Sequence, residues 1–130
     1  MLYIGNFLYL TNQQEQAEDK RRHGEFNLIV EADSDDKAIE LCRERISGLR
    51  QSSDFFEGSC RVFFNQLIEF ERAPNATAAL VNFKSIAGDP QMPFIGCTLP
   101  SEEADDCRIF DWDGSHPEID GEKDHPFMTF

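Results

Sequence analysis

Several features that would assign a function directly are missing from this sequence. None of its apolar runs approaches the roughly 20 residues that a membrane-spanning helix needs. The apolar residues 1–10 also lack the preceding basic segment and the following small-residue cleavage pattern of a signal peptide. The glycines form neither a GxGxxG nor a GxxxxGK(S/T) loop, so no phosphate-binding cradle is indicated. From these absences we expect a cytoplasmic protein that makes no membrane contact.

Cysteine is sparse, and no CxxC or HxxxH pair preorganises two metal ligands. The four cysteines are Cys42, Cys60, Cys97 and Cys107. Cys42 lies on a helical apolar stripe and Cys60 on a β pattern, where a reduced cysteine packs as a small hydrophobe. Because cytoplasmic thiols are kept reduced, we predict four free thiols, with a Cys97 to Cys107 bridge as the alternative.

Positive charge is scarce, since 12 Lys and Arg residues face 25 Asp and Glu residues, for a formal net charge of −13. Ten of the acids, against two basic residues, fall in residues 101–130, named here the acidic C-terminal segment. Such a negative field repels nucleic acid and membrane surfaces and attracts basic proteins or cations. Residues 20–23, KRRH, form the one basic cluster, which we interpret as a solvated turn or an internal partner for the acidic C-terminal segment. No direct nucleic-acid contact is expected.

The length of 130 residues, 40% apolar and with 12 Phe, fits one compact domain with a substantial core. We predict a single domain over residues 1–112. Residues 113–130 lack apolar periodicity and are predicted to be an acidic loop or tail. The closing residues Phe127, Met128 and Phe130 are unusual for a disordered tail and could dock onto the body or onto a partner.

The first half of the chain predicts two strands and a helix. Residues 1–10 are apolar on both faces, apart from Asn6, as in a buried strand. Residues 11–24 are polar and are expected to be an exposed connection, and residues 25–32 form the second strand. A helix over residues 35–50 follows, capped by Ser34 or Asp33. Its apolar stripe recurs at steps of three and four residues and comprises Ile39, Cys42, Ile46 and Leu49.

The second half predicts further strands. Residues 60–72 alternate, so one face should hold Cys60, Val62, Phe64, Ile68 and Phe70. A turn at 73–76 would return residues 78–86 as the second half of a hairpin. Residues 94–99 form a short strand, and 108–112 form either a last strand or an apolar clip. The fold class is therefore α+β: a mostly antiparallel sheet of about five strands, in the order β-β-α-β-β-β, with one main helix packed on one face.

The constellations that could carry catalysis are incomplete. Asp111, Asp113, Ser115 and Glu122 match positions 1, 3, 5 and 12 of an EF-hand calcium loop. His116, however, occupies the position that needs glycine, and we interpret the match as a solvated acidic loop. A nucleophile built on Cys97 or Cys107 would need a nearby histidine, which no spacing supplies. We therefore expect no metal, no cofactor and no catalytic residue.

The charge pattern favours a small, non-enzymatic binding protein that engages a basic or nucleic-acid-binding protein through its negative surface. Carboxylates spaced along a surface can substitute for phosphates, so an inhibitor of the immunity, anti-restriction or anti-CRISPR type is one form, by analogy of charge and size only. The alternatives are an accessory or regulatory domain of a housekeeping complex and a small cysteine- or metal-dependent enzyme. The predicted partner-binding residues are Glu102, Glu103, Asp105, Asp106, Asp111, Trp112 and Asp113.

Overall fold

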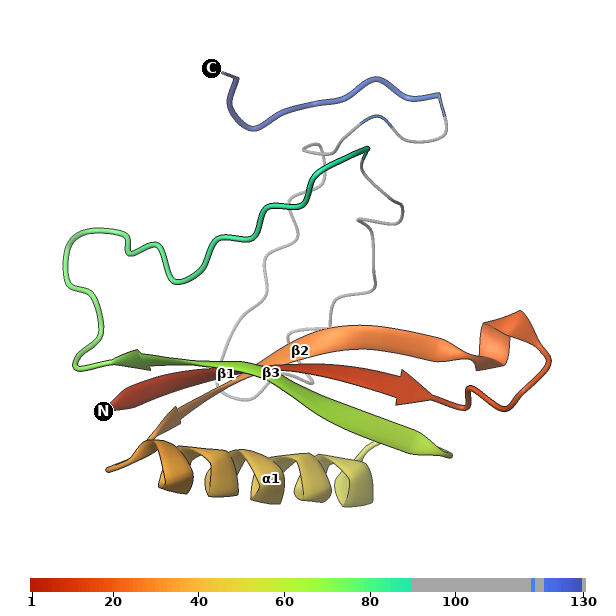
Figure 1. Ribbon diagram of the computed structural model, residues 1–130, viewed down its shortest axis with the longest axis horizontal. Coiled ribbons are helices and arrows are strands. Elements are labelled where there is room, and N and C mark those ends of the chain that lie inside the picture. The colour runs from red at the N-terminus through yellow and green to blue at the C-terminus, as the bar shows by residue number, and fades with distance from the viewer. Residues whose placement is uncertain (90–117, 119–120, 130) are drawn as a thin grey trace. The chain divides into compact units, whose positions relative to one another are not determined.

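The computed structural model describes residues 1–89, 118 and 121–129. The chain divides into two compact units, Met1–Lys84 and Ser85–Phe130. All helices and strands of the described residues belong to the first unit (Figure 1). They are β1 (Leu2–Thr11), the short 3-10 helix η1 (Glu18–Lys20), β2 (Arg22–Glu31), α1 (Asp35–Ser52) and β3 (Cys60–Phe70). The predicted domain boundary at 112/113 lies outside the described residues.

A three-stranded antiparallel sheet in the order β2-β1-β3 forms the body of the first unit. The helix α1 covers one face of this sheet (Figure 1). The α+β class and the helix on one face are confirmed. β1 is the central strand: its odd-numbered side chains, such as Tyr3, face α1, whereas its even-numbered apolar side chains lie on the other face, where Leu8 is 41% exposed.

The prediction of about five strands is wrong for the described residues, which contain three. Residues 78–86, expected to return along β3, form neither helix nor strand, and the Leu80 and Phe83 side chains are each 82% exposed. One alternating face carries Ala79, Val81 and Phe83 but ends at Ser85, and the other carries Asn82 and Lys84, so the local pattern does not by itself fix a pairing partner. The predicted strand at 94–99 and the strand or clip at 108–112 lie outside the described residues.

A β-bulge changes which β3 residues face the helix. Phe64 pairs with Phe7 of β1, whereas Gln66 pairs with the preceding residue Asn6, so Asn65 is the extra residue. Before the bulge, Val62 and Phe64 share the face of Phe7. After it, Leu67 and Glu69 take that face, and Ile68 and Phe70 move to the other. The prediction of one face from Cys60 through Phe70 is therefore wrong beyond Phe64.

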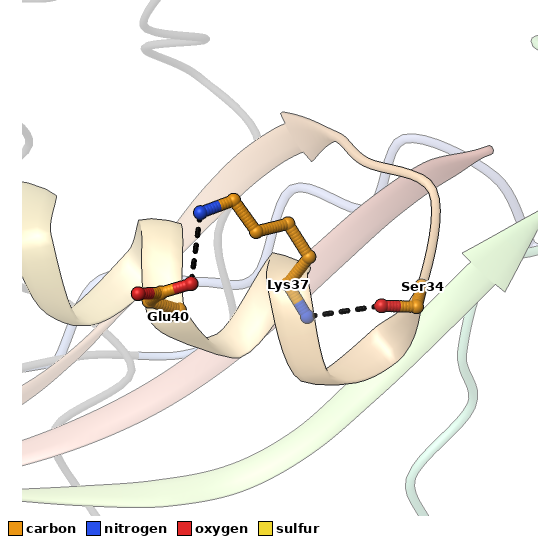
Figure 2. Close-up of polar contacts among 3 residues, drawn as sticks. All are labelled: Ser34, Lys37 and Glu40. Carbon is orange, nitrogen blue, oxygen red and sulfur yellow. Dashed lines mark hydrogen bonds and ion pairs between the residues drawn. The ribbon is translucent and has the colours of Figure 1, made fainter.

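The helix α1 begins at the predicted residue and ends two residues later than predicted. Ser34 is the cap, and its Oγ accepts a hydrogen bond from the Lys37 backbone N–H at 3.2 Å (Figure 2). Ala38 and Cys42 are its buried residues, and Ala38 and Leu41 pack with Tyr3 of β1. The small side chain of Ala38 lets the first turn of the helix lie close to the Tyr3 ring, which fixes the helix over this end of the sheet.

An aromatic cluster fills the other half of the core. Phe7 stacks on Phe26 of β2 with ring centroids 5.2 Å apart, and Phe26 contacts Phe56 at 5.0 Å. Phe56 comes from the α1–β3 loop and is only 9% exposed, so this loop aromatic belongs to the core. Arg50 makes this placement possible, because its guanidinium donates hydrogen bonds to the carbonyl oxygens of Phe56 and Gly58.

Candidate functional site

The partner-binding residues predicted in the acidic C-terminal segment are not placed by the structure. Glu102, Glu103, Asp105, Asp106, Asp111, Trp112 and Asp113 all lie outside the described residues. The same holds for most of the EF-hand-like pattern at 111–122. The described residues of the first unit carry two other candidate surfaces.

Five exposed acids gather at one end of the sheet. β1 begins there, paired with the last residues of β2 and β3, so that Leu2 lies opposite Glu31 and Tyr3 opposite Glu69. The helix α1 starts at the same end, which Figure 1 shows beside the label of the N-terminus. We name this group the acidic sheet end: Glu31, Asp33, Asp35, Asp36 and Glu69.

The nearby positive groups leave these carboxylates available. Lys37 forms an ion pair with Glu40, Nζ to Oε2 at 2.8 Å, one turn further along the helix (Figure 2). The N-terminal ammonium of Met1 donates to the carbonyl oxygen of Ala32 at 2.9 Å. Within the part of the chain that the structure describes, no residue of the acidic sheet end forms an ion pair. Asp35 and Asp36 also lie in the first turn of α1, where the helix dipole favours negative charge.

A buried tyrosine lies beneath this end. Tyr3 is fully buried, and none of the described residues makes a hydrogen bond of good geometry with its hydroxyl. Burial raises the pKa of Tyr3, and the neighbouring carboxylate of Glu69 raises it further, with smaller contributions from Asp35 and Asp33. The phenol therefore holds its proton more tightly than a free tyrosine and adds no charge to the site.

The sheet face away from α1 is a second candidate surface. Asn6, at its centre, donates from Nδ2 to Oδ1 of Asn27 and accepts at Oδ1 from Nδ2 of Asn65, both at 2.8 Å. Apolar side chains lie on either side of this amide ladder, among them Ile29, which is 67% exposed, and Phe63 at 45%. We name this surface the open face; it contains apolar side chains from all three strands, with charges at its two ends.

The thiols and histidines in the described residues do not form an activated site. Cys42 and Cys60 are free, and burial raises the pKa of both thiols, although Arg50 opposes the rise at Cys60. A raised pKa lowers the thiolate fraction at neutral pH and with it the nucleophilicity. No group of three or more His, Cys, Asp or Glu residues in the described ranges could hold a metal ion. Cys97, Cys107 and His116 lie outside these ranges.

The basic cluster at 20–23 lies at the opposite end of the sheet from the acidic sheet end, where β1 ends and β2 begins. Arg21 donates from Nη1 to the carbonyl oxygens of Glu15 and Gln16, at 3.1 and 2.8 Å. It therefore holds the β1–β2 connection, as expected for a residue of a solvated turn. His23 is exposed on β2.

Sequence reasoning missed the acidic sheet end because its members come from three elements. By sequence alone, Asp35 and Asp36 are typical helix-start residues, and Glu69 belongs to the polar side of an alternating strand. The run EADSDD at 31–36, an acid at a strand end followed by acids at a helix start, was the available signal. Glu69 comes close to this run only because β3 pairs with β1 on the side opposite β2.

Comparison of the chain with protein-family models, curated proteins and solved structures gives no match. None of the described helices is long and apolar enough to span a membrane.

Proposed function

We propose that this chain is a small, non-enzymatic binding protein that engages a basic protein through its negative surfaces. The observation that supports this most directly is the acidic sheet end, where five exposed carboxylates from β2, the β2–α1 loop, α1 and β3 gather without an ion-pair partner among the described residues. The whole chain carries a net charge of −13, so its long-range electrostatic field is negative as well.

The rigid placement of these carboxylates favours a specific surface over a merely solubilising one. Glu31 and Glu69 are held by strand pairing on either side of β1, and Asp35 and Asp36 by a capped helix. The backbone keeps these like charges at one end of the sheet, so a cationic partner gains both long-range attraction and relief of their mutual repulsion. Such attraction accelerates association and is screened by salt.

The acidic C-terminal segment belongs to the same proposal. Its acids would add negative charge to the chain, and Trp112 would supply an aromatic anchor of the kind that concentrates binding energy. A partner with a basic groove for nucleic acid fits this combination, because spaced carboxylates can occupy phosphate positions. Inhibition of such a protein is the function that we infer.

The test is capture of basic proteins from a nuclease-treated extract of the host at low salt, followed by elution with rising salt. Two variants of equal charge are compared with the native chain. One neutralises the acidic sheet end through Glu31→Gln, Asp33→Asn, Asp36→Asn and Glu69→Gln. The control neutralises exposed acids elsewhere through Glu15→Gln, Glu25→Gln, Glu44→Gln and Glu57→Gln.

The proposal predicts a basic protein that the native chain and the control retain, that the acidic-sheet-end variant loses, and that rising salt elutes. Equal retention by both variants would exclude the acidic sheet end as the contact. Recovery of no basic protein would exclude the function itself. Deletion of residues 113–130 tests the C-terminal contribution, with the expectation that the body stays folded while retention falls.

The open face favours a second candidate, an accessory or regulatory domain of a larger complex. Leu8, Ile29 and Phe63 expose apolar surface there, and apolar contacts are insensitive to salt or strengthened by it. A partner that resists salt elution and is lost on Ile29→Lys would support this function in place of the first.

A further inference from the structure

The outer edge of β3 differs from the other surfaces of the sheet. β3 runs for 11 residues at one side of the sheet, and no strand among the described residues pairs with its outer side. An edge of this kind presents unpaired N–H and C=O groups in strand geometry, which is a template for another strand.

The sequence of β3 does little to prevent such pairing. Residues 62–68, VFFNQLI, contain no charge, glycine or proline between Arg61 and Glu69. Phe63 and Phe64 expose 45% and 47% of their surface on opposite faces of the strand. Natural edge strands are usually protected by lysine, proline or inward charges. The other edge strand, β2, carries charged residues at Arg22, Glu25 and Glu31 along its length. β3 is therefore the edge better suited to pair with another strand.

The bulge selects one register for pairing between two β3 strands. In an antiparallel pair, opposite residues point to the same face of the sheet. Because Asn65 is the extra residue, Phe63 and Ile68 share the open face, and Phe64 and Leu67 share the helix face. Self-pairing in which Phe63 lies opposite Ile68 of the second copy, and Phe64 opposite Leu67, keeps every pair on one face. If Asn65 lay opposite Asn65 of the second copy, Phe63 would lie opposite a residue whose side chain points to the other face of the sheet.

From this self-complementarity we propose that two copies of the chain associate through antiparallel β3 strands, giving a continuous six-stranded sheet with a helix from each copy on the same side. The pairing joins apolar side chains on both faces. In this register neither Arg61 nor Glu69 lies opposite the same residue of the second copy, so no like charges face each other across the two strands.

The size of this contact predicts weak association. Eleven residues at about 3.3 Å each, on a sheet about 10 Å thick, give an edge of roughly 360 Å² per copy. A stable interface buries roughly 800 Å² per partner. We therefore expect a concentration-dependent dimer with a dissociation constant in the micromolar range.

The effect of salt distinguishes this dimer from the binding of a basic protein that the proposed function requires. Each copy carries a net charge of −13, so two copies repel and added salt should strengthen their pairing. Binding of a basic protein should weaken under the same change. Glu69 belongs to both, but the β3 pairing uses its backbone and not its carboxylate, so neutralising the acidic sheet end should not weaken the dimer and either proposal can fail without the other.

Sedimentation equilibrium of the full chain tests the proposal at about 5 to 500 µM protein, in about 0.05 M and 0.5 M salt. Phe63→Lys places a charge at the centre of the edge. The matched control is Ile29→Lys, which makes the same change at an exposed open-face residue of β2. We expect a dimer that tightens with salt, that Phe63→Lys weakens at least about tenfold, and that Ile29→Lys leaves within about twofold. Far-UV circular dichroism confirms that both variants are folded.

A second measurement needs no variant. Backbone amides of residues 62–68 that point away from β1 should exchange slowly at high protein concentration and quickly at low concentration. A monomer under all conditions would overturn the proposal. So would a dimer that Ile29→Lys disrupts as strongly as Phe63→Lys, or one whose protected amides lie in β2.

Discussion

The Nδ2 amide of Asn6 donates a hydrogen bond to Oδ1 of Asn27, 2.8 Å away, in the middle of the β1–β2 pair. Because Asn65 completes the ladder from the other side, one buried side chain ties three strands together at the point where β3 bulges. The extra residue thus brings a third amide into reach of the first two.

Asn6→Ala should lower the free energy of unfolding by about 1–2 kcal/mol, since two side-chain hydrogen bonds of a buried group are lost. Asn27→Ala should cost less, because Asn27 is exposed and its loss leaves Asn6 bonded to Asn65. Urea unfolding monitored by circular dichroism gives both values. Equal costs would show that the ladder is not centred on Asn6.

Arg50 should stabilise the fold through the α1–β3 loop. Its guanidinium bonds two loop carbonyls, which fixes Phe56 at positive φ in the aromatic cluster. Arg50→Met keeps the aliphatic stem and should lower the free energy of unfolding by about 1–3 kcal/mol. Arg43→Met, at an exposed helix residue, should change it by no more than about 0.5 kcal/mol. Similar values in urea unfolding would contradict the role of Arg50.

Elements with strong local signals were predictable from the sequence. The helix start is fixed by Ser34 and the acids after it, and the apolar step pattern is fixed by helix geometry, so α1 was predicted nearly to its ends. The two-sided apolar pattern of residues 1–10 predicted a buried strand, and β1 is the central one.

Features that depend on tertiary pairing were not predictable. The alternating polar and apolar residues of β3 do not show that Asn65 is the extra residue of a bulge, because the bulge is defined only by the pairing of β3 with β1. Residues 78–86 contain enough β-forming residues to suggest a hairpin, but pairing requires a partner face that local propensity does not specify. The acidic sheet end likewise arises from strand order, whereas a charge count favoured the acidic C-terminal segment.

Two glycine-to-alanine changes should shift stability in opposite directions. Gly58 has φ +71°, and an added Cβ would lie 2.1 Å from Oδ1 of Asn12, which accepts the Ser59 backbone N–H. Gly58→Ala should therefore lower the free energy of unfolding by about 1–3 kcal/mol. Gly48 lies inside α1 with open space around it, so Gly48→Ala should raise that free energy by about 0.5–1 kcal/mol. Thermal and urea unfolding should agree on both signs, and a stabilising Gly58→Ala would exclude this loop geometry.

The unpaired hydroxyl of Tyr3 predicts a pH-dependent stability. Burial raises its pKa, and the carboxylates of Glu69, Asp35 and Asp33 raise it further. The folded protein therefore holds the phenol proton more tightly than the unfolded chain, in which a tyrosine titrates near pH 10. The stabilisation that this preference provides is fully present below about pH 10 and is lost as the pH rises through the folded pKa.

Tyr3→Phe removes both the titration and the unsatisfied hydroxyl. Its free energy of unfolding should be higher than that of the native chain at neutral pH, because a buried polar group without a partner is unfavourable. It should also fall less steeply between about pH 9 and about pH 11.5. Urea unfolding across this range, with Tyr9→Phe as control, measures both effects. The raised pKa of Cys42 contributes equally in all three proteins, so a difference in slope reports Tyr3. A less stable Tyr3→Phe at neutral pH would instead mean that the hydroxyl is bonded in solution, with the carboxylate of Glu69, which contributes to the raised pKa of Tyr3, as the acceptor.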